Sequence, residues 1–194
     1  APGQQEALAD LLSAATWLPY ESPRRAVDAY AELADATPFP VVADFARYAE
    51  LRLRFEMGER VQNRIAAMGF ITKVWAVGPF PNSGDAGLAS AAPPEQGFSA
   101  EATYPGAVVP VAWQELGGDA ETGYVDLGQR LVPSESAVSF AAVGFKLLRA
   151  ETVRIAIAAD GGYRLWLDGK PVAERSKDWG GFFARDTVEV PLTR

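Results

Sequence analysis

The chain has 194 residues, of which 48% are hydrophobic, and it carries a formal net charge of −7 with no Cys and no His. This length and hydrophobic share predict a folded chain with a buried core, and the acidic balance argues against nucleic acid or an anionic membrane as the main partner. The missing Cys and His exclude disulfides, Cys-His and Ser-His catalysis and the usual zinc sites, so we expect no cofactor.

Nothing in the sequence predicts a membrane span or a leader peptide. The chain has no run of about 18 apolar residues, the length that a helix needs to cross a bilayer. Its first residues lack the charged-then-apolar pattern of a signal peptide. We therefore expect no membrane span, and any export signal would already have been removed.

The distribution of glycine predicts a boundary near Gly69. Only Gly3 and Gly58 occur before it, and all the other glycines follow. Because glycine is disfavoured inside helices and common in turns between strands, this change indicates two kinds of structure. We predict a helical module over 1–69 and a β-sandwich over 70–194.

The first module is predicted to form amphipathic helices joined by short loops. Apolar side chains recur at helical spacing over 4–18, 22–36 and 40–58, and a shorter helix is expected within 59–68. Ser22 is the predicted N-cap of the second helix, with Pro23 at its first position, and Gly58 ends the third. Short loops between such helices indicate antiparallel helical hairpins, and the Ala-rich pattern resembles tetratricopeptide-type repeats, although no two copies share a fixed period.

The second module is predicted to form short strands. Apolar and polar residues alternate over 152–158, 163–167 and 187–190, and Gly-, Pro- and Asn-containing turns punctuate the sequence between Pro79 and Gly181. Many short strands with such turns are typical of a jelly-roll β-sandwich, so the expected fold class is α+β.

Two stretches resemble a β-sandwich found in large exported bacterial proteins. The first is WAVGPFPNSGDAGLASAAPPE at 75–95, followed by GYVDL at 123–127, and the second is the hairpin DGGYRLWLDG at 160–169. The pattern is also similar to the protective-antigen sandwich and to galactose-binding-like jelly rolls. Trp75, Pro79 and Phe80 would then anchor the core where the sandwich begins.

The resemblance implies a location outside the cytoplasm, in the periplasm, at the cell surface or secreted. It also implies that helical repeats precede the sandwich within a multidomain protein. A strand that follows in the family has no counterpart before Arg194. We therefore expect that the sandwich lacks its final strand, that another segment supplies it, or that the chain is part of a longer protein.

A calcium site is the one metal site that the resemblance suggests. Relatives of the protective-antigen sandwich hold Ca²⁺ with two consecutive Asp residues, whereas this chain has Ala159 before Asp160. Asp160 is thus a weak calcium candidate, and its expected role is in a turn with Gly161 and Gly162. Asp168 and Gly169 are predicted to form the tight turn of a hairpin.

Aromatic and charged residues near the C-terminus form the predicted ligand-binding set. Trp166 has two interpretations, a buried core residue or a surface platform for a sugar or peptide. The loop 175–186 places aromatic side chains beside a Gly-Gly pair and charged groups, which suits recognition of carbohydrate or protein, although such aromatics also plug the ends of sandwiches. The set consists of Trp166, Arg175, Asp178, Trp179, Phe182 and Phe183.

Catalysis is not expected. The acidic residues between Asp160 and Asp178 lie close in sequence, but a hairpin turn offers no pocket that would raise one carboxyl pKa, and Ser134, Ser136 and Ser139 have no His and no well-placed Lys. We therefore predict a non-catalytic binding or assembly module of a larger exported bacterial protein, which recognises a protein or a surface. The alternative is an ancillary carbohydrate-binding module that serves an enzyme domain.

Overall fold

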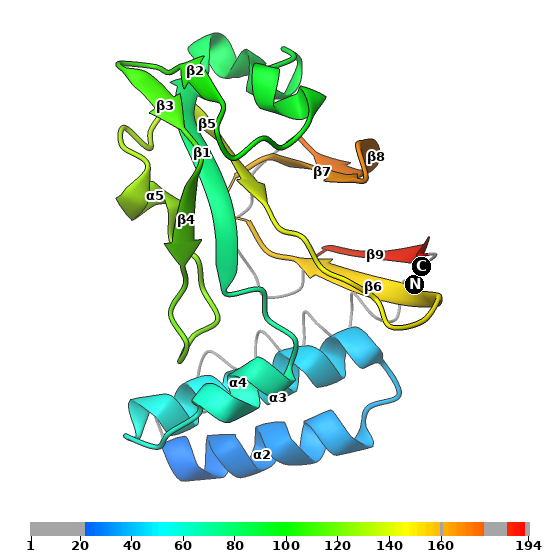
Figure 1. The fold of residues 1–194 in the computed structure, drawn as a ribbon. Helices are drawn as coiled ribbons and strands as arrows, with labels where there is room; N and C mark the ends of the chain where they lie inside the picture. The colour runs from blue at the N-terminus through cyan, green and yellow to red at the C-terminus, as the bar shows by residue number, and fades with distance from the viewer. Residues whose placement is uncertain (1–21, 160, 177–185, 193–194) are drawn as a thin grey trace. The chain divides into compact units, whose positions relative to one another are not determined.

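The computed structural model describes residues 22–159, 161–176 and 186–192. It confirms a mixed α+β fold, in which N-terminal helices are followed by antiparallel β-sheets (Figure 1). The described chain divides into two compact units. The helical unit contains the residues up to Phe70 together with Asp119–Gly123, and the β unit contains Ile71–Gly118 and the residues from Tyr124 onward. The helix predicted over 4–18 lies outside the described residues.

The helical unit contains α2 (Pro23–Ala36), α3 (Pro40–Glu56) and α4 (Gln62–Ala67). α2 and α3 each begin with a proline at the first helical position, where the missing N–H costs nothing. Ser22 occupies the predicted N-cap position, but its side chain makes no capping hydrogen bond; its carbonyl accepts a bond from the Ala26 N–H at 3.0 Å. Gly58, with a φ of 85°, follows α3 in the left-handed conformation that typically ends a helix.

Two apolar clusters hold the helices together. The larger lies between α2 and α3 and consists of Ala26, Val27, Tyr30, Ala34, Val42, Ala46 and Leu53. The smaller joins α3 to α4 through Leu51, Val61 and Ile65. Small alanines in the first cluster allow the two helix backbones to approach closely, so the Ala-rich pattern in the sequence serves packing.

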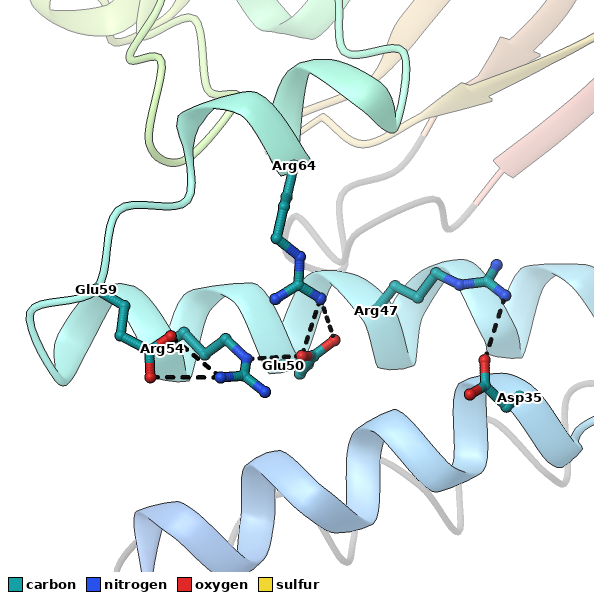
Figure 2. A network of polar contacts seen from close by, with 6 residues as sticks. All are labelled: Asp35, Arg47, Glu50, Arg54, Glu59 and Arg64. Atoms are coloured by element: carbon teal, nitrogen blue, oxygen red, sulfur yellow. Dashed lines mark hydrogen bonds and ion pairs between the residues drawn. The ribbon is translucent and has the colours of Figure 1, made fainter.

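A buried carboxylate adds a polar link between α3 and α4 (Figure 2). The side chain of Glu50 is only 5% exposed, yet its two oxygens accept hydrogen bonds from Arg54 at 2.7 Å and from Arg64 at 2.9 Å. Arg54 also donates to Glu59 at 3.0 Å, and these contacts raise the pKa of its guanidinium. The two arginines therefore balance the buried negative charge of Glu50, as a buried charge requires.

The short loop Asp119–Gly123 belongs to the helical unit although it follows a strand of the β unit. The Tyr48 hydroxyl donates to the Thr122 carbonyl at 2.9 Å, and the Gln62 amide donates to Glu121 at 2.6 Å. A Cβ on Gly123 would lie 2.4 Å from the ring of Phe70, so the loop backbone packs directly on that ring. The chain thus returns to its own N-terminal helices.

The β unit contains nine strands among the described residues. Their bounds are β1 (Lys73–Pro81), β2 (Thr103–Pro105), β3 (Pro110–Ala112), β4 (Gln114–Gly117), β5 (Ala137–Ala142), β6 (Glu151–Ile157), β7 (Tyr163–Leu167), β8 (Lys170–Arg175) and β9 (Asp186–Leu192). Short helical turns intervene, namely η1 (Ser83–Leu88), η2 (Pro93–Gln96) and α5 (Leu127–Arg130). The antiparallel sheets have the strand orders β4-β1-β5, β2-β3, β6-β9 and β7-β8.

β1 is the central strand of the sheet β4-β1-β5 and is covered on both faces. One face carries Ala76 against Leu116 and Leu131. The other carries Val77 and Phe80 with Trp113, and Trp75 packs against the edge of this cluster. Phe80 is 5% exposed, so it anchors the core as predicted from the sequence. Burial on both faces explains why β1 has an almost continuous apolar sequence.

The Asn-containing turn after β1 is fixed by hydrogen bonds. The Asn82 side chain accepts a bond from the Gly87 N–H at 2.7 Å, and the Asn82 N–H donates to the Ser136 carbonyl at 3.1 Å. A Cβ on Gly87 would lie 2.3 Å from a methyl of Val138. The Asn and Gly of this motif therefore close the turn against the neighbouring strand.

The predicted hairpin at Asp168-Gly169 is confirmed, because β7 pairs with β8 across it. Asp168 and Gly169 have φ values of 48° and 75°, and a two-residue turn with positive φ at both positions suits this dipeptide. β6, in contrast, pairs with β9, which lies beyond this hairpin in the sequence. The hairpin β7-β8 therefore lies, in the sequence, between the two strands of the pair β6-β9.

Candidate functional site

The structure places two of the predicted ligand-binding residues. Trp166 lies in β7 and Arg175 ends β8. The remaining four, Asp178, Trp179, Phe182 and Phe183, and the calcium candidate Asp160 lie outside the described residues. In a strand, successive side chains point to opposite faces, so Trp166 and Tyr163, the cross-strand neighbour of Arg175, belong to opposite faces of the hairpin. The structure therefore does not bring Trp166 and Arg175 together.

Trp166 is half-buried and contacts two other side chains. The guanidinium of Arg164 lies 5.7 Å from the centre of its ring, within cation–π range, and the ring of Phe140 lies 6.3 Å away. Arg164 in turn donates to Glu174 at 2.7 Å and lies 3.6 Å from Glu95. Trp166 therefore takes part in the packing of the hairpin against β5.

The Glu of the Pro-Pro-Glu motif has a structural role in these contacts. One oxygen of Glu95 accepts a hydrogen bond from the Ala92 N–H at 3.1 Å, and the other faces Arg164. Glu95 thus closes the turn of η2 and also links that turn to β7. Two motifs that are far apart in the sequence meet through this ion pair.

The opposite face of the hairpin carries a polar cluster at Asp186, the first residue of β9. One Asp186 oxygen accepts a hydrogen bond from the Tyr163 hydroxyl at 2.7 Å, and the other accepts one from Arg175. Burial and the negative charge of Asp186 raise the pKa of Tyr163 to about 12. The cluster links β7-β8 to β6-β9, and Arg175 has a carboxylate partner within the fold.

A half-exposed phenylalanine marks an aromatic cluster that the sequence reasoning missed. The ring of Phe98 is 50% exposed and lies 5.0 Å from Trp113 and 5.7 Å from Trp75. The Trp113 indole N–H lies 3.4 Å from the Tyr104 hydroxyl. Little in the sequence indicates this cluster, because Phe98 is an isolated aromatic residue in a segment rich in Gly, Ser and Ala.

The outer edge of β5 is a second surface that the sequence reasoning missed. Among the described strands, β5 pairs only with β1. β5 is also the only described strand that contains neither a charged residue nor a proline. Free edges are normally protected by charge, proline or a short length, and β4 at the other side of the same sheet is short and exposes Glu115. We call the unpaired backbone side of Ala137–Ala142 the β5 edge.

The segment that follows β5 exposes apolar side chains. We call Val143–Ala150 the β5 connector; in Figure 1 it is the yellow trace that leaves β5 and turns back into β6. Val143 is 44% exposed, Phe145 50% and Leu148 91%. Lys146 and Arg149 lie among them, so the connector is both apolar and basic in an acidic chain. Clustered exposed apolar side chains mark contact surfaces on soluble proteins.

Metal ligation and membrane crossing can be checked for the part of the chain that the structure describes. Within residues 22–159, 161–176 and 186–192, no three or more acidic side chains are gathered where they could hold a metal ion. In the same ranges, no helix is both long enough and apolar enough to cross a membrane. The carboxylates of Glu50, Glu95 and Asp186 each accept bonds from other parts of the fold.

Comparison with known proteins gives no relative, because no family model, curated protein or solved structure matches this chain.

Proposed function

We propose that this chain is a non-catalytic binding and assembly module that contacts another protein through the β5 edge and the β5 connector. The observation that carries this proposal is the exposure of Val143, Phe145 and Leu148 directly after a strand with an unprotected edge. An edge offers backbone hydrogen bonds, and the neighbouring apolar side chains offer area to bury. This combination is used in recognition by strand addition.

The charge of the connector narrows the kind of partner. Lys146 and Arg149 stand beside the exposed apolar side chains, and Arg149 lies 3.5 Å from Glu151. The chain as a whole is acidic, with a net charge of −7. A basic, apolar segment favours a partner protein that presents an uncharged or acidic strand. An anionic membrane is a poorer partner, because the negative charge on the rest of this chain would repel it.

The finer fold assignment and the location are part of the proposal. The β unit would be a jelly-roll sandwich and the helical unit a tetratricopeptide-like hairpin array. Both would belong to the class of exported bacterial proteins that the motifs at 75–95 and 160–169 resemble. The chain would then act outside the cytoplasm as one module of a larger assembly.

The test is a complex that depends on the connector. Wild-type protein and the double variant Phe145→Ser, Leu148→Ser are lightly cross-linked in extracts of the source organism, and the products are sized and identified. We expect a defined complex with wild type and its loss with the variant, while circular dichroism shows that the variant is folded. Phe98→Ser, a half-exposed aromatic elsewhere in the β unit, is the matched control and should retain the complex. A complex that survives the double variant would refute the proposal.

A second candidate function is carbohydrate recognition at Phe98. Its exposed ring stands beside two indoles, and exposed aromatic rings supported from below are suitable platforms for the apolar face of a sugar. In this case Phe98→Ala should abolish retention on immobilised polysaccharide, whereas Phe145→Ser should not change it. Unchanged retention of Phe98→Ala, or no retention of wild type on any polysaccharide, would exclude the candidate.

A further inference from the structure

We propose that the β5 edge is a self-association site, at which the β5 strands of two copies of this chain pair in antiparallel orientation. This proposal rests on the assembly function proposed above and identifies its partner as a second copy. The pairing would extend the sheet β4-β1-β5 across a two-fold axis into the same sheet of the second copy.

The described strands differ in how well their composition protects an edge. Every other described strand contains a charged residue or a proline, for example Glu115 in β4 and Pro191 in β9. Such residues hinder the addition of another strand. β5 has neither, and its neighbours extend the uncharged stretch from Ser136 to Phe145. An edge of this kind is a ready template for a further strand.

The net charge of the molecule favours an uncharged contact between two copies. Two copies, each with a net charge of −7, repel one another over most of their surfaces. A two-fold contact also brings residues near the axis close to their own copies, so a charge there would face a like charge. An uncharged strand at the contact avoids this repulsion. When the strand pairs with the same strand of a second copy, the result is a closed two-fold dimer, the commonest form of homo-oligomer.

The side chains of two β5 strands fit one another in one register. Two-fold antiparallel pairing places one residue opposite its own copy, and Ala141 is the one exposed residue of β5. With Ala141 at the centre, Val143 lies opposite Ser139 of the second copy. If the extended chain continues, Phe145 lies opposite Ala137 of that copy. Each large exposed side chain then meets a small one, which is the pattern that lets neighbouring strands pack.

The same register is consistent on the other face of the sheet. Phe140 lies opposite Ala142 of the second copy, so a large side chain again meets a small one. Val138, Phe140 and Ala142 border the cluster around Val77 and are only partly buried in one copy. Dimerisation would cover them further and would continue the apolar layer across the axis.

The experiment places charges at the centre of the proposed axis. Sedimentation of the full chain over a range of concentrations measures the dimer, for wild type and for Ala141→Lys and Ala141→Glu alone and mixed in equal amounts. Like charges directly opposite each other disfavour strand pairing, so each single variant should dissociate at least about tenfold more readily than wild type. The mixture should regain the dimer, because Lys then faces Glu. Gln114→Lys, on the exposed edge strand β4, is the control and should dimerise like wild type.

Several outcomes would overturn the proposal. They are a wild type that is monomeric at every concentration, single variants that dimerise normally, and a mixture of folded variants that stays monomeric. Circular dichroism of each variant establishes that the protein is folded. A monomeric wild type that still forms the connector-dependent complex would overturn self-association and leave the proposed binding function standing. Loss of both would overturn both.

Discussion

The buried carboxylate of Glu50 gives the sharpest prediction for stability. Glu50→Gln keeps the shape of the side chain but removes the charge that Arg54 and Arg64 share. The amide has a single acceptor oxygen, and its NH₂ group would face guanidinium N–H donors. The variant therefore loses charge-assisted hydrogen bonds, removes the Glu50 counter-ion from Arg64 and leaves Arg54 with only Glu59 in this network.

The size of the effect follows from the exposure of the partners. Breaking a fully buried ion pair costs about 3–5 kcal/mol, whereas an exposed pair contributes about 0–1 kcal/mol. Glu50 is 5% exposed, but Arg54 is 28% and Arg64 51% exposed, so water can hydrate the released guanidinium groups. We expect Glu50→Gln to lower the free energy of unfolding by about 2–3 kcal/mol, between these limits.

Urea unfolding followed by far-UV circular dichroism measures this change, because the helices dominate the signal. With a urea dependence of about 1–1.5 kcal/mol per M for a unit of this size, the midpoint should fall by about 2 M. Glu59→Gln is the matched control, since Glu59 is 48% exposed and bonds only to Arg54 within this network, and it should cost less than about 1 kcal/mol. Equal midpoints for the two variants would refute the reasoning that burial makes Glu50 important.

Two further predictions concern Tyr163 and Gly123. The pKa of Tyr163 is raised from 10.0 to about 12, so the folded state holds the phenolic proton more tightly than the unfolded state. The stability that comes from the bond to Asp186 is complete below pH 10 and is lost as the pH rises through about 12. Tyrosinate absorbance should therefore show a late-titrating group that is missing in Tyr163→Phe. Burial also raises the pKa of Tyr30, so a late contribution from Tyr30 should remain in both proteins. Equal late-titrating absorbance in wild type and Tyr163→Phe would contradict this. Gly123→Ala should lower the thermal midpoint of the helices, because its φ of 71° disfavours a side chain and the new Cβ would clash with Phe70. Gly58→Ala is the control, because Gly58 has a φ of 85° but a Cβ built there meets nothing within 4 Å. This variant introduces the backbone strain alone, so its thermal midpoint should fall clearly less. Equal falls in the two midpoints would show that the contact with Phe70 is unimportant.

Local signals in the sequence predicted much of the fold. Pro23 and Gly58 mark helix ends, and each acts through its own backbone geometry without help from distant residues. Asp168-Gly169 predicted a hairpin for the same reason, because positive φ at both positions suits the turn. Alternation predicted β6, β7 and β9 as strands.

Long-range features could not be predicted in this way. Alternation shows which side chains share a face, but it does not name the partner strand, so the pairing of β6 with β9 was not foreseen. Glu50 follows the polar pattern of an exposed helix position, and its burial depends on Arg64 from the next helix. The loop Asp119–Gly123 has the composition of an ordinary turn, and only the tertiary structure shows that it packs with helices.

The candidate site was also only partly visible in the sequence. The sequence indicates Trp166 and Arg175 only as single residues, but their roles depend on partners in other elements. Trp166 packs near Phe140 of β5, and Arg175 donates a hydrogen bond to Asp186 of β9. The uncharged stretch around β5 is plain in the sequence, but charge matters there only because the strand is at an edge, and edge position is a property of the sheet.

The docking of Asp119–Gly123 onto the helices has a consequence for the order of events during synthesis. The helices α2, α3 and α4 emerge from the ribosome before this loop, and their contacts with one another are local in sequence. The bonds from Tyr48 to Thr122 and from Gln62 to Glu121 span 74 and 59 residues. At about 5–20 residues per second, several seconds of translation separate the end of α4 from the loop that completes its unit. The nascent helical unit therefore stays incomplete until strands β1 to β4 have been made. During this time Gly123 does not yet cover the ring of Phe70.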